Sequence, residues 1–557
     1  MIKSDENQNA NEIQMSIFEE ATFNGASIES AARDANVSSA TIRNWIKTGY
    51  LHQEINGSIS TASIDNFFAN IAGQEKLNRR ANKSHKDSHN HMNLTSDFLE
   101  KITNSNGDVN NLADEYEASL SESFRNKEGI YYTPHHIIAN LLKDAAQPLA
   151  SMKFLDPCCG SGNFIMRAIE LGFHPENVYG YDIDPVAVGI TKKRIFELTG
   201  YSSSKIKNED FLDRATKPKK EFFDYIYTNP PWGKKLSKEE KDKYGQAFHA
   251  GKSVDTSSLF FFACLDYLNE GGELGLLLPD SFFNIATFET ARIRALSFDV
   301  VRLVDYEKPF KGLMTKAFAF VLRKKNIDQN SESIVCESNG KIYKRSTKSF
   351  LKNPKSIINF QSDSISAKII EHVFSIPHVT LLGRAKWGLG IVTGNNEKFL
   401  KQNPEIEYIP VFRGADIRKE GLLSPSCYIP SNLSLYQQVA PLDLYQAEVK
   451  LIYRFISSNL CFYCDTEQRY VLNSANMLIP NVDFPIKPSQ LSDLLNSEFL
   501  NWLFVKLFKT HKVLRSDLEA LPIHSDYFRK YPSFNEQDFL EFLSIERFGN
   551  GTYGIKK

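Results

Sequence analysis

Short apolar runs alternate with amphipathic stretches along the middle of the chain, between about residues 120 and 325. Four of the runs have the length and the flanking polar residues of buried strands, namely 153–156, 177–182, 223–228 and 272–278. The stretches 162–171 and 185–198 have the apolar spacing of helices. Strands that alternate with helices predict a doubly wound α/β sheet, in which ligands bind at the carboxyl ends of the strands.

Two other patterns flank this region. Residues 26–33 and 38–46 each place apolar side chains at helical spacing, and capping serines precede the second stretch. Two short helices joined by a tight turn predict an N-terminal helix-turn-helix, which is similar to the DNA-binding helices of MerR-type regulators. The alternative is a helical hairpin that packs on the rest of the protein without touching DNA. After residue 380, aromatic-rich runs broken by Gly and Pro predict a separate, mixed α+β domain.

These patterns divide the chain into five predicted segments. They are a helix-turn-helix domain (1–75), a linker and helical lead-in (76–120), the α/β domain (121–325), a connecting segment (326–379) and the C-terminal α+β domain (380–557).

Composition is that of a soluble globular protein, with 42% hydrophobic and 24% charged residues. The polar N-terminus lacks the apolar core of a signal peptide, and no apolar run approaches the ~20 residues of a membrane span. We therefore expect a cytoplasmic location. The net charge of −1 neither supports nor excludes nucleic-acid binding, because the 66 Lys and Arg residues can be concentrated on one face.

Seven scattered cysteines suit a reducing compartment. Cys461 and Cys464 form a lone CxxC without a second pair of ligands nearby, so a half-buried strand is favoured over a zinc site. No metal ion is expected.

The first chemical motif is the loop from Asp156 to Phe164, which follows one strand and opens a helix. Gly160 and Gly162 let the backbone turn tightly and approach a ligand. Asp182 ends the next strand, where a carboxylate can accept hydrogen bonds from a ribose. Ile165 takes the place of the third glycine of the dinucleotide fingerprint, and an acidic loop suits a sulfonium better than a pyrophosphate. S-adenosylmethionine is thus favoured over NAD.

The second motif is Asn229-Pro-Pro-Trp232, directly after the strand 223–228. The two prolines fix the backbone, so the Asn229 side-chain carbonyl and the Pro230 carbonyl can face one point. Two such acceptors would draw the amino nitrogen of adenine toward tetrahedral geometry and expose its lone pair for methyl transfer. Trp232 offers a flat face to a base flipped out of the duplex, at a cost of roughly a few kcal/mol. The bland alternative is a rigid surface turn.

The order of five motifs resembles the gamma group of amino-methylating DNA methyltransferases, which includes the TaqI and Eco57I enzymes. The motifs are Tyr131–Pro134, Asp156–Phe164, Tyr181–Pro185, Glu209–Leu212 and Asn229–Trp232. The resemblance implies a Rossmann-like S-adenosylmethionine-dependent methyltransferase core followed by a target-recognition domain. Residues 387–396 and 408–413 look like the start of an Eco57I-type recognition domain, with a β-hairpin that does not touch DNA as the alternative.

The resemblance also assigns residues to the cofactor and to the target base. The cofactor residues are Thr133 and Pro134 at the methionine part, Asp156, Gly160 and Gly162 along the pocket, Asp182 at the ribose, and Asp210 and Phe211 beside the adenine ring. Catalysis falls to Asn229, Pro230, Pro231 and Trp232, and Phe310 joins Trp232 in stacking on the target base. Trp232 replaces the usual Tyr or Phe of the family, and Cys158-Cys159 replace the more common Ala-Cys.

The resemblance implies site-specific methylation of adenine N6 in double-stranded DNA, within a restriction-modification system that also contains a cognate restriction endonuclease. Methylation of RNA, of a protein glutamine amide or of cytosine N4 are the alternatives within the same chemistry. A bifunctional restriction enzyme and a DNA-binding regulator with an inactive core are the alternatives from other classes. Lys234, Lys235 and Lys238 either contact phosphates near the flipped nucleotide or form a solvated helix start.

Overall fold

The computed structural model describes residues 128–556 except 146–148, 219–220, 311–312, 314 and 329. Before residue 128 it describes shorter stretches, the longest of which are 25–34, 95–103 and 109–121. The chain separates into two compact units, Met1–Phe124 and Arg125–Lys557.

The first unit contains part of the predicted helix-turn-helix. Helix α2 (Ile28–Asp34) confirms the first predicted helix, and Ser39, Ile42, Arg43 and Ile46 in the second stretch are helical. Val37 and Trp45, on which the prediction also rested, lie outside the described residues. Strands β1 (Gly25–Ala26) and β2 (Ile59–Ser60) pair beside α2, and Ala31, Ala32, Ile42, Leu51 and Ile59 form a small core.

The predicted linker, up to residue 94, lies outside the described residues. The lead-in that follows is helical. Helix α6 (Val109–Ser119) buries Val109, Leu112 and Tyr116, and the Tyr116 ring centroid lies 5.0 Å from that of Phe98.

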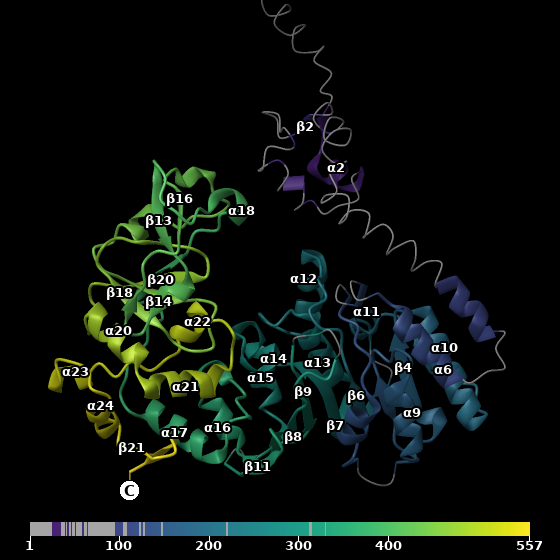
Figure 1. The fold of residues 1–557 in the computed structure, drawn as a ribbon. Coiled ribbons are helices and arrows are strands. Elements are labelled where there is room, and N and C mark those ends of the chain that lie inside the picture. Colours follow the sequence, from purple (N-terminus) through teal and green to yellow (C-terminus); the bar gives the residue numbers. More distant parts are fainter. Residues whose placement is uncertain are drawn as a thin grey trace, which may run out of the picture. The chain divides into compact units, whose positions relative to one another are not determined.

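The second unit contains the predicted α/β sheet. Among the described residues, nine strands pair in the order β11-β10-β8-β9-β7-β6-β3-β4-β5, and Figure 1 shows β6, β7, β8 and β9 side by side. The four predicted strands are confirmed as β3 (Phe154–Asp156), β4 (Val178–Asp182), β6 (Phe223–Thr228) and β7 (Leu268–Pro279). These four pair in parallel, so their carboxyl ends meet at one edge of the sheet.

Five further strands complete this sheet. They are β5 (Ile206–Asn208), β8 (Asp299–Asp305), β9 (Ala317–Arg323), β10 (Ile334–Ser338) and β11 (Lys341–Arg345). Strand β9 runs antiparallel to both β7 and β8, and the sheet continues past residue 325 into β10 and β11.

Helices connect and cover the strands. The two predicted helices are confirmed as α9 (Asn163–Glu170) and α10 (Pro185–Thr199). Helix α13 (Thr256–Tyr267) is buried along nearly its whole length and packs against β7, which explains its unbroken apolar run Leu259–Leu265. The remaining helices up to residue 375 are α8 (His135–Leu141), α11 (Phe211–Ala215), α12 (Lys238–Ala247), α14 (Ser281–Asn284), α15 (Glu289–Ala295), α16 (Thr347–Leu351) and α17 (Ser364–Ser375).

Small sheets and helices make up the C-terminal region, as predicted for a mixed α+β domain. One sheet has the order β12-β20-β17-β18 and another β16-β13-β19. Cys464 lies in β18 and Cys461 directly before it, which confirms the strand interpretation of the CxxC. The strands are β12 (Ala385–Leu389), β13 (Tyr408–Phe412), β14 (Ile417–Arg418), β15 (Gly421–Leu422), β16 (Cys427–Pro430), β17 (Lys450–Arg454), β18 (Phe462–Asp465), β19 (Tyr470–Val471), β20 (Ala475–Pro480), β21 (Ile545–Arg547) and β22 (Tyr553–Ile555).

The C-terminal helices bury a second apolar core, to which α21 contributes Phe499, Leu503 and Phe504. The helices are α18 (Asn396–Phe399), α19 (Leu442–Tyr445), α20 (Pro488–Asn496), α21 (Glu498–Phe508), α22 (Arg515–Leu518), α23 (Tyr527–Lys530) and α24 (Glu536–Phe542). Within the described parts of the chain, every helix is too short or too polar to cross a membrane.

Candidate active site

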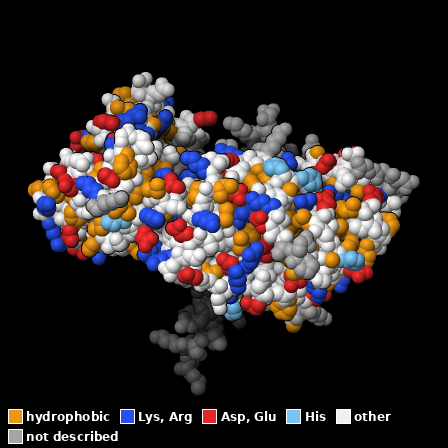
Figure 2. All heavy atoms as spheres, turned by 90° about the horizontal axis from the view of Figure 1, so that it is seen from below, with side chains coloured by type: hydrophobic (Ala, Val, Ile, Leu, Met, Phe, Trp, Pro, Cys, Tyr) orange, Lys and Arg blue, Asp and Glu red, His pale blue; other side chains and the backbone are white. Residues whose placement is uncertain are grey.

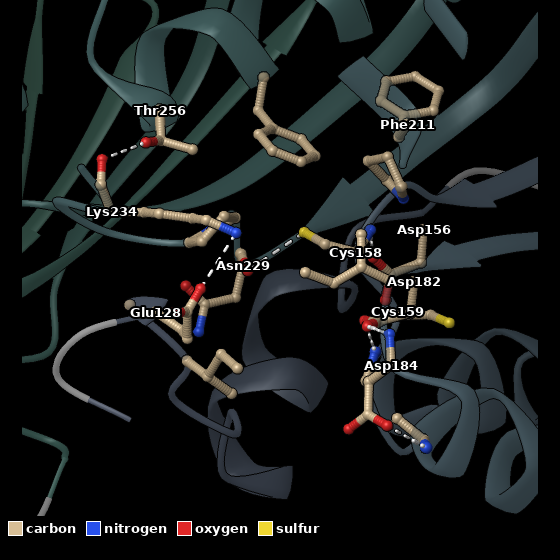
Figure 3. Close-up of a pocket in the computed structure, with 18 of the residues that line it drawn as sticks. Glu128, Asp156, Cys158, Cys159, Asp182, Asp184, Phe211, Asn229, Lys234 and Thr256 are labelled. Carbon is tan, nitrogen blue, oxygen red and sulfur yellow. Dashed lines mark hydrogen bonds and ion pairs between the residues drawn. The ribbon is translucent and has the colours of Figure 1, made fainter. Parts of the chain in front are cut away.

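A pocket opens at the carboxyl ends of β3, β4 and β6 (Figure 3). It brings together eight of the residues singled out in the sequence: Thr133, Asp156, Gly160, Asp182, Asp210, Phe211, Asn229 and Pro231. Pro134, Gly162, Pro230, Trp232 and Phe310 do not line it. The sheet topology accounts for this gathering, because parallel strands deliver the residues that follow them to one edge.

Asp156 ends β3 and is the most buried carboxylate of the pocket, with 1% of its surface exposed. Its Oδ1 accepts hydrogen bonds from the Thr228 hydroxyl (2.6 Å) and the Cys158 backbone N–H (3.2 Å). Its Oδ2 is buried and has no hydrogen-bond partner among the described residues. Burial raises the pKa of Asp156 to about 7. A cationic group placed at Oδ2 would stabilise the carboxylate form of Asp156, and no other described residue uses this oxygen as an acceptor.

The glycines of the loop have different roles. Gly160 (φ +50°) lines the pocket, and its backbone N–H donates a hydrogen bond to Asp182 Oδ2 at 2.8 Å. Gly162 (φ +92°) precedes α9, and a Cβ there would lie 2.8 Å from Thr191 of α10. Gly162 thus lets α9 and α10 approach each other, whereas Gly160 presents backbone to the pocket.

Asp182 is held by backbone donors on both sides. Besides the Gly160 N–H, it accepts a 2.9 Å hydrogen bond from the Asp184 N–H at Oδ1. Burial raises its pKa to about 6. Asp184 caps α10 through the N–H groups of Val186 and Ala187 and also lines the pocket. Asp184 was not singled out in the sequence, although Asp before Pro185 is an N-cap signal.

Asp210 and Phe211 form the far wall of the pocket. The Asp210 carboxylate caps α11 by accepting from the N–H of Leu212 at 2.8 Å. The Phe211 ring is 1% exposed and stacks on Phe260, with centroids 6.1 Å apart. The side chain of Asp210 thus shapes the wall through its helix cap, while Phe211 gives the wall an apolar surface.

Asn229 follows β6, and its side-chain amide is oriented by the chain itself. Its Nδ2 donates a hydrogen bond to the Tyr131 carbonyl oxygen at 2.7 Å. Its Oδ1 is buried and has no partner among the described residues. Because Tyr131 binds the amide nitrogen, the carbonyl oxygen is the atom left for a ligand. Cys158 Sγ lies 2.8 Å from Thr228 Oγ1 and 3.4 Å from the backbone oxygen of Asn229, so it links the glycine loop to this residue (Figure 3).

The segment Glu128–Tyr131 holds the rest of the Asn229–Trp232 loop. The Trp232 N–H donates to the Gly129 carbonyl oxygen at 3.2 Å. Gly129 has φ +72°, and a Cβ there would lie 2.5 Å from the Trp232 carbonyl oxygen. Glu128 and Lys234 form a 3.1 Å ion pair beside Asn229 (Figure 3). No signal in the sequence marked Glu128 or Gly129, because both act through residues about a hundred positions away.

The buried Trp232 and Phe310 form an aromatic cluster with the partly buried Tyr131. The centroid of Phe310 lies 5.4 Å from each of the other two rings, and Trp232 and Phe310 meet edge to face. The Trp232 Nε1–H donates to the Leu277 carbonyl oxygen at 3.2 Å. The structure therefore brings the two predicted base-stacking residues together behind Asn229, with 7% and 8% of their surfaces exposed.

The remaining predicted residues lie at helix starts or in the loop. Thr133 is buried in the pocket wall, and Pro134 precedes α8. Pro230 and Pro231 lie between Asn229, which donates to the Tyr131 carbonyl, and Trp232, which donates to the Gly129 carbonyl. Lys238 is exposed at the first turn of α12, and Lys234 pairs with Glu128.

Comparison with known proteins agrees with this geometry. Residues 107–359 match the N-6 DNA Methylase family, and residues 409–523 match the TaqI-like C-terminal specificity domain. The chain is 46% identical over 408 residues to the Type II methyltransferase M.VspI of Vibrio sp. (strain 343), covering 73% of this chain and 100% of that protein. It is 28% identical over 219 residues to the Type II methyltransferase M.HincII of Haemophilus influenzae, covering 38% and 40%.

A solved structure shares the fold. A nuclease-deletion mutant of the Type ISP restriction-modification enzyme LlaGI, in complex with a DNA substrate mimic, matches with a TM-score of 0.50 and 12% identity. The match covers 93% of this chain and 70% of that one.

Taken together, the site and the relatives define a DNA methyltransferase. The chain belongs to the N-6 DNA methylase family and carries a TaqI-like C-terminal specificity domain. Membership of this family implies S-adenosyl-L-methionine as cofactor and DNA as partner.

Proposed function

We propose that this protein transfers a methyl group to the N6 atom of adenine at a specific sequence in double-stranded DNA. The observation that carries the proposal is the unpartnered, buried Oδ1 of Asn229, whose amide nitrogen is bound by Tyr131. An amino group is a donor, so an exocyclic amine is the ligand that satisfies this oxygen. The modification role within a restriction-modification system is supported by the similarity to M.VspI.

The pocket residues fit S-adenosylmethionine, which supplies an electrophilic methyl group on a sulfonium. The unpartnered Oδ2 of Asp156 suits the cationic part of this cofactor, and Gly160 lets backbone approach it closely. Asp182 and Asp184 offer carboxylate oxygens near a ribose, and Phe211 with Asp210 suits an adenine ring. Thr133 lines the adjacent wall, where the methionine part would lie, and Pro134 follows it at the start of α8.

Asn229 acts by positioning and polarising the target amine. Its Oδ1 and the Pro230 carbonyl accept the two N–H hydrogens, which returns electron density from the ring to the nitrogen lone pair. The cofactor, when bound, would supply the methyl group to this nitrogen with its thioether as the leaving group, and one amine proton would be released to solvent. An amide oxygen is too weak a base to keep that proton, so Asn229 is an acceptor rather than a general base.

Trp232 and Phe310 provide aromatic surface for the flipped base. The two rings already touch, so a base that stacks on either must enter beside the cluster or displace one ring from the other. Leaving the duplex costs the base roughly a few kcal/mol, and aromatic stacking of about 1–3 kcal/mol offsets that cost.

The proposal is tested by nucleoside analysis. Purified protein is incubated with S-adenosylmethionine and duplex DNA, the DNA is digested, and modified nucleosides are measured by mass spectrometry. We expect N6-methyladenine in the wild type and none in an Asn229→Ala variant that still binds cofactor. N4-methylcytosine would overturn the choice of base. Modification of RNA or of a protein glutamine with unmodified DNA would overturn the choice of substrate.

A further inference from the structure

The segment that joins α21 to α22 concentrates positive charge. Lys506, Lys509, Lys512 and Arg515 recur at every third position, His511 lies among them, and residues 506–515 contain no Asp or Glu. The whole chain, by contrast, has a net charge of −1. Lys and Arg are mixed with Asp and Glu on the face drawn in Figure 2, so that face offers no surface of a single sign. We name residues 506–515 the basic segment.

The basic segment is fixed against the catalytic core. The Asn284 side chain donates to the Phe508 carbonyl oxygen at 2.9 Å, and the Asn359 side chain donates to the Lys506 carbonyl oxygen at 3.2 Å. Lys355 donates to the carbonyl oxygen of Ser516, which directly follows the segment. Its charges are therefore held at a constant position relative to the sheet.

That position is the edge of the sheet where Asn229 lies. A second cavity is lined by Asp280 after β7, Lys316 before β9, and Lys509, Thr510 and His511 of the basic segment. Strand β7 separates β6 from β9, and neighbouring strands are about 4.8 Å apart, so β9 lies about 10 Å across the sheet from β6. A DNA strand rises about 3.4 Å per nucleotide. The part of the cavity at Lys316, where β9 begins, is thus about three nucleotides across the sheet from a base held at Asn229.

The three lysines of the segment, Lys506, Lys509 and Lys512, form no direct ion pair among the described residues, although the more distant Asp305 and Glu307 act on Lys509. Arg515 pairs with Glu519, and Lys316 pairs with Glu307. Across the described ranges, no carboxylate lies within ion-pair distance of Lys509 or Lys512. The other end of the segment adds a donor: the Arg515 guanidinium lies 5.6 Å from the Trp387 ring centroid, and the buried Trp387 Nε1–H has no acceptor among the described residues.

We propose that the basic segment binds backbone phosphates of the DNA strand beside the target adenine, with Lys509 and Lys512 as the phosphate contacts. This inference rests on the proposed function, because it takes the bound polymer to be duplex DNA with its target base at Asn229. Phosphate contacts carry no base information, so the segment orients the duplex while other residues read the sequence.

The test is the salt dependence of DNA binding. Fluorescence anisotropy of a labelled duplex is measured over a series of salt concentrations for wild type, Lys509→Gln, Lys512→Gln and the double variant. Each lost phosphate contact lowers the slope of log Kd against log salt by about 0.9, and the double variant by about 1.8. Lys530→Gln is the matched control, because Lys530 is an exposed lysine on α23 whose ammonium lies 5.0 Å from the centroid of the Tyr531 ring.

Slopes in the Lys509 and Lys512 variants that equal that of Lys530→Gln would overturn the inference. If wild-type protein still methylates DNA at low salt, such a result leaves the proposed function in place. Wild-type protein that binds no duplex at any salt concentration would contradict both. Isothermal titration with S-adenosylmethionine checks that each variant retains its cofactor site.

Discussion

Replacing Asp156 with Asn should change how stability depends on pH. In the protein without cofactor, burial raises the Asp156 pKa from the 3.8 of an ordinary Asp to about 7. Between about pH 5 and pH 7 the folded protein therefore keeps a proton that the unfolded chain has released. Each pKa unit corresponds to about 1.4 kcal/mol, and the folded group is half deprotonated at pH 7, so Asp156 lowers the free energy of unfolding by about 2 kcal/mol across that range.

The sign follows from the direction of the shift. The contribution of Asp156 is fully present below its unfolded pKa and is lost as pH rises through about 7. The Asp156→Asn variant has no proton to lose, so its stability relative to wild type should rise by about 2 kcal/mol from pH 5 to pH 7. The Thr228 hydroxyl can still donate to the Asn oxygen, so the packing of β3 against β6 is preserved.

Urea unfolding of both proteins at pH 5, 6, 7 and 8 without cofactor measures this difference. Other titrating groups, including Asp182, are common to the two proteins and largely cancel. If the free energies of unfolding of the two proteins change in parallel with pH over this range, the pKa of Asp156 is not raised by burial. With S-adenosylmethionine present, wild type should bind more tightly at pH 8 than at pH 5, because the carboxylate form is the one that attracts a cation, and the variant should lack this dependence.

Two further substitutions test the support of the catalytic loop. Gly129→Ala forces a Cβ to within 2.5 Å of the Trp232 carbonyl oxygen, so kcat should fall at least tenfold while the Kd for cofactor changes little. Gly271→Ala is its control, since Gly271 has φ +78° and open space around the added Cβ; equal losses in both would refute a specific contact. Trp232→Phe keeps an aromatic face but loses the hydrogen bond to Leu277, so it should retain methylation and lose about 1 kcal/mol of stability in urea unfolding. Inactive, fully stable Trp232→Phe protein would contradict that assignment.

The parts of the site that the sequence predicted are those set by local pattern. The glycine loop, Asp182 and Asn229 each follow a strand whose apolar run is visible in the sequence, so their meeting at one edge follows from parallel topology. The resemblance predicts Gly162 in the pocket, but its missing Cβ makes room for Thr191 of α10. That contact depends on the angle between two helices, which spacing does not encode.

The contacts that the sequence did not reveal are long-range. Gly129 and Tyr131 hold Trp232 and Asn229 through backbone carbonyls, and a carbonyl carries no signature of residue type. Strands β10 and β11 extend the sheet beyond residue 325. Strand β10 alternates between buried and partly buried positions over only five residues, and β11 buries only Arg345, so neither has a strong apolar run. The net charge near zero did not indicate the basic segment, because the net charge of a chain does not show how its charged residues are distributed over the surface.

The DNA-binding role of the N-terminal helices stays a prediction. Helix α2 and the helical residues of the following stretch share a small core around Ile42, which fits both a helix-turn-helix and a packed hairpin.

Sequencing of modified bases in genomic DNA tests the central claim most directly. A host without DNA methylation expresses either the wild-type chain or the Asn229→Ala variant. We predict N6-methyladenine at one sequence motif in the first genome and its absence in the second, because the free Oδ1 of Asn229 is the acceptor for the target amine. The same methylated motif in both genomes, or an unmodified wild-type genome from active protein, would contradict the account.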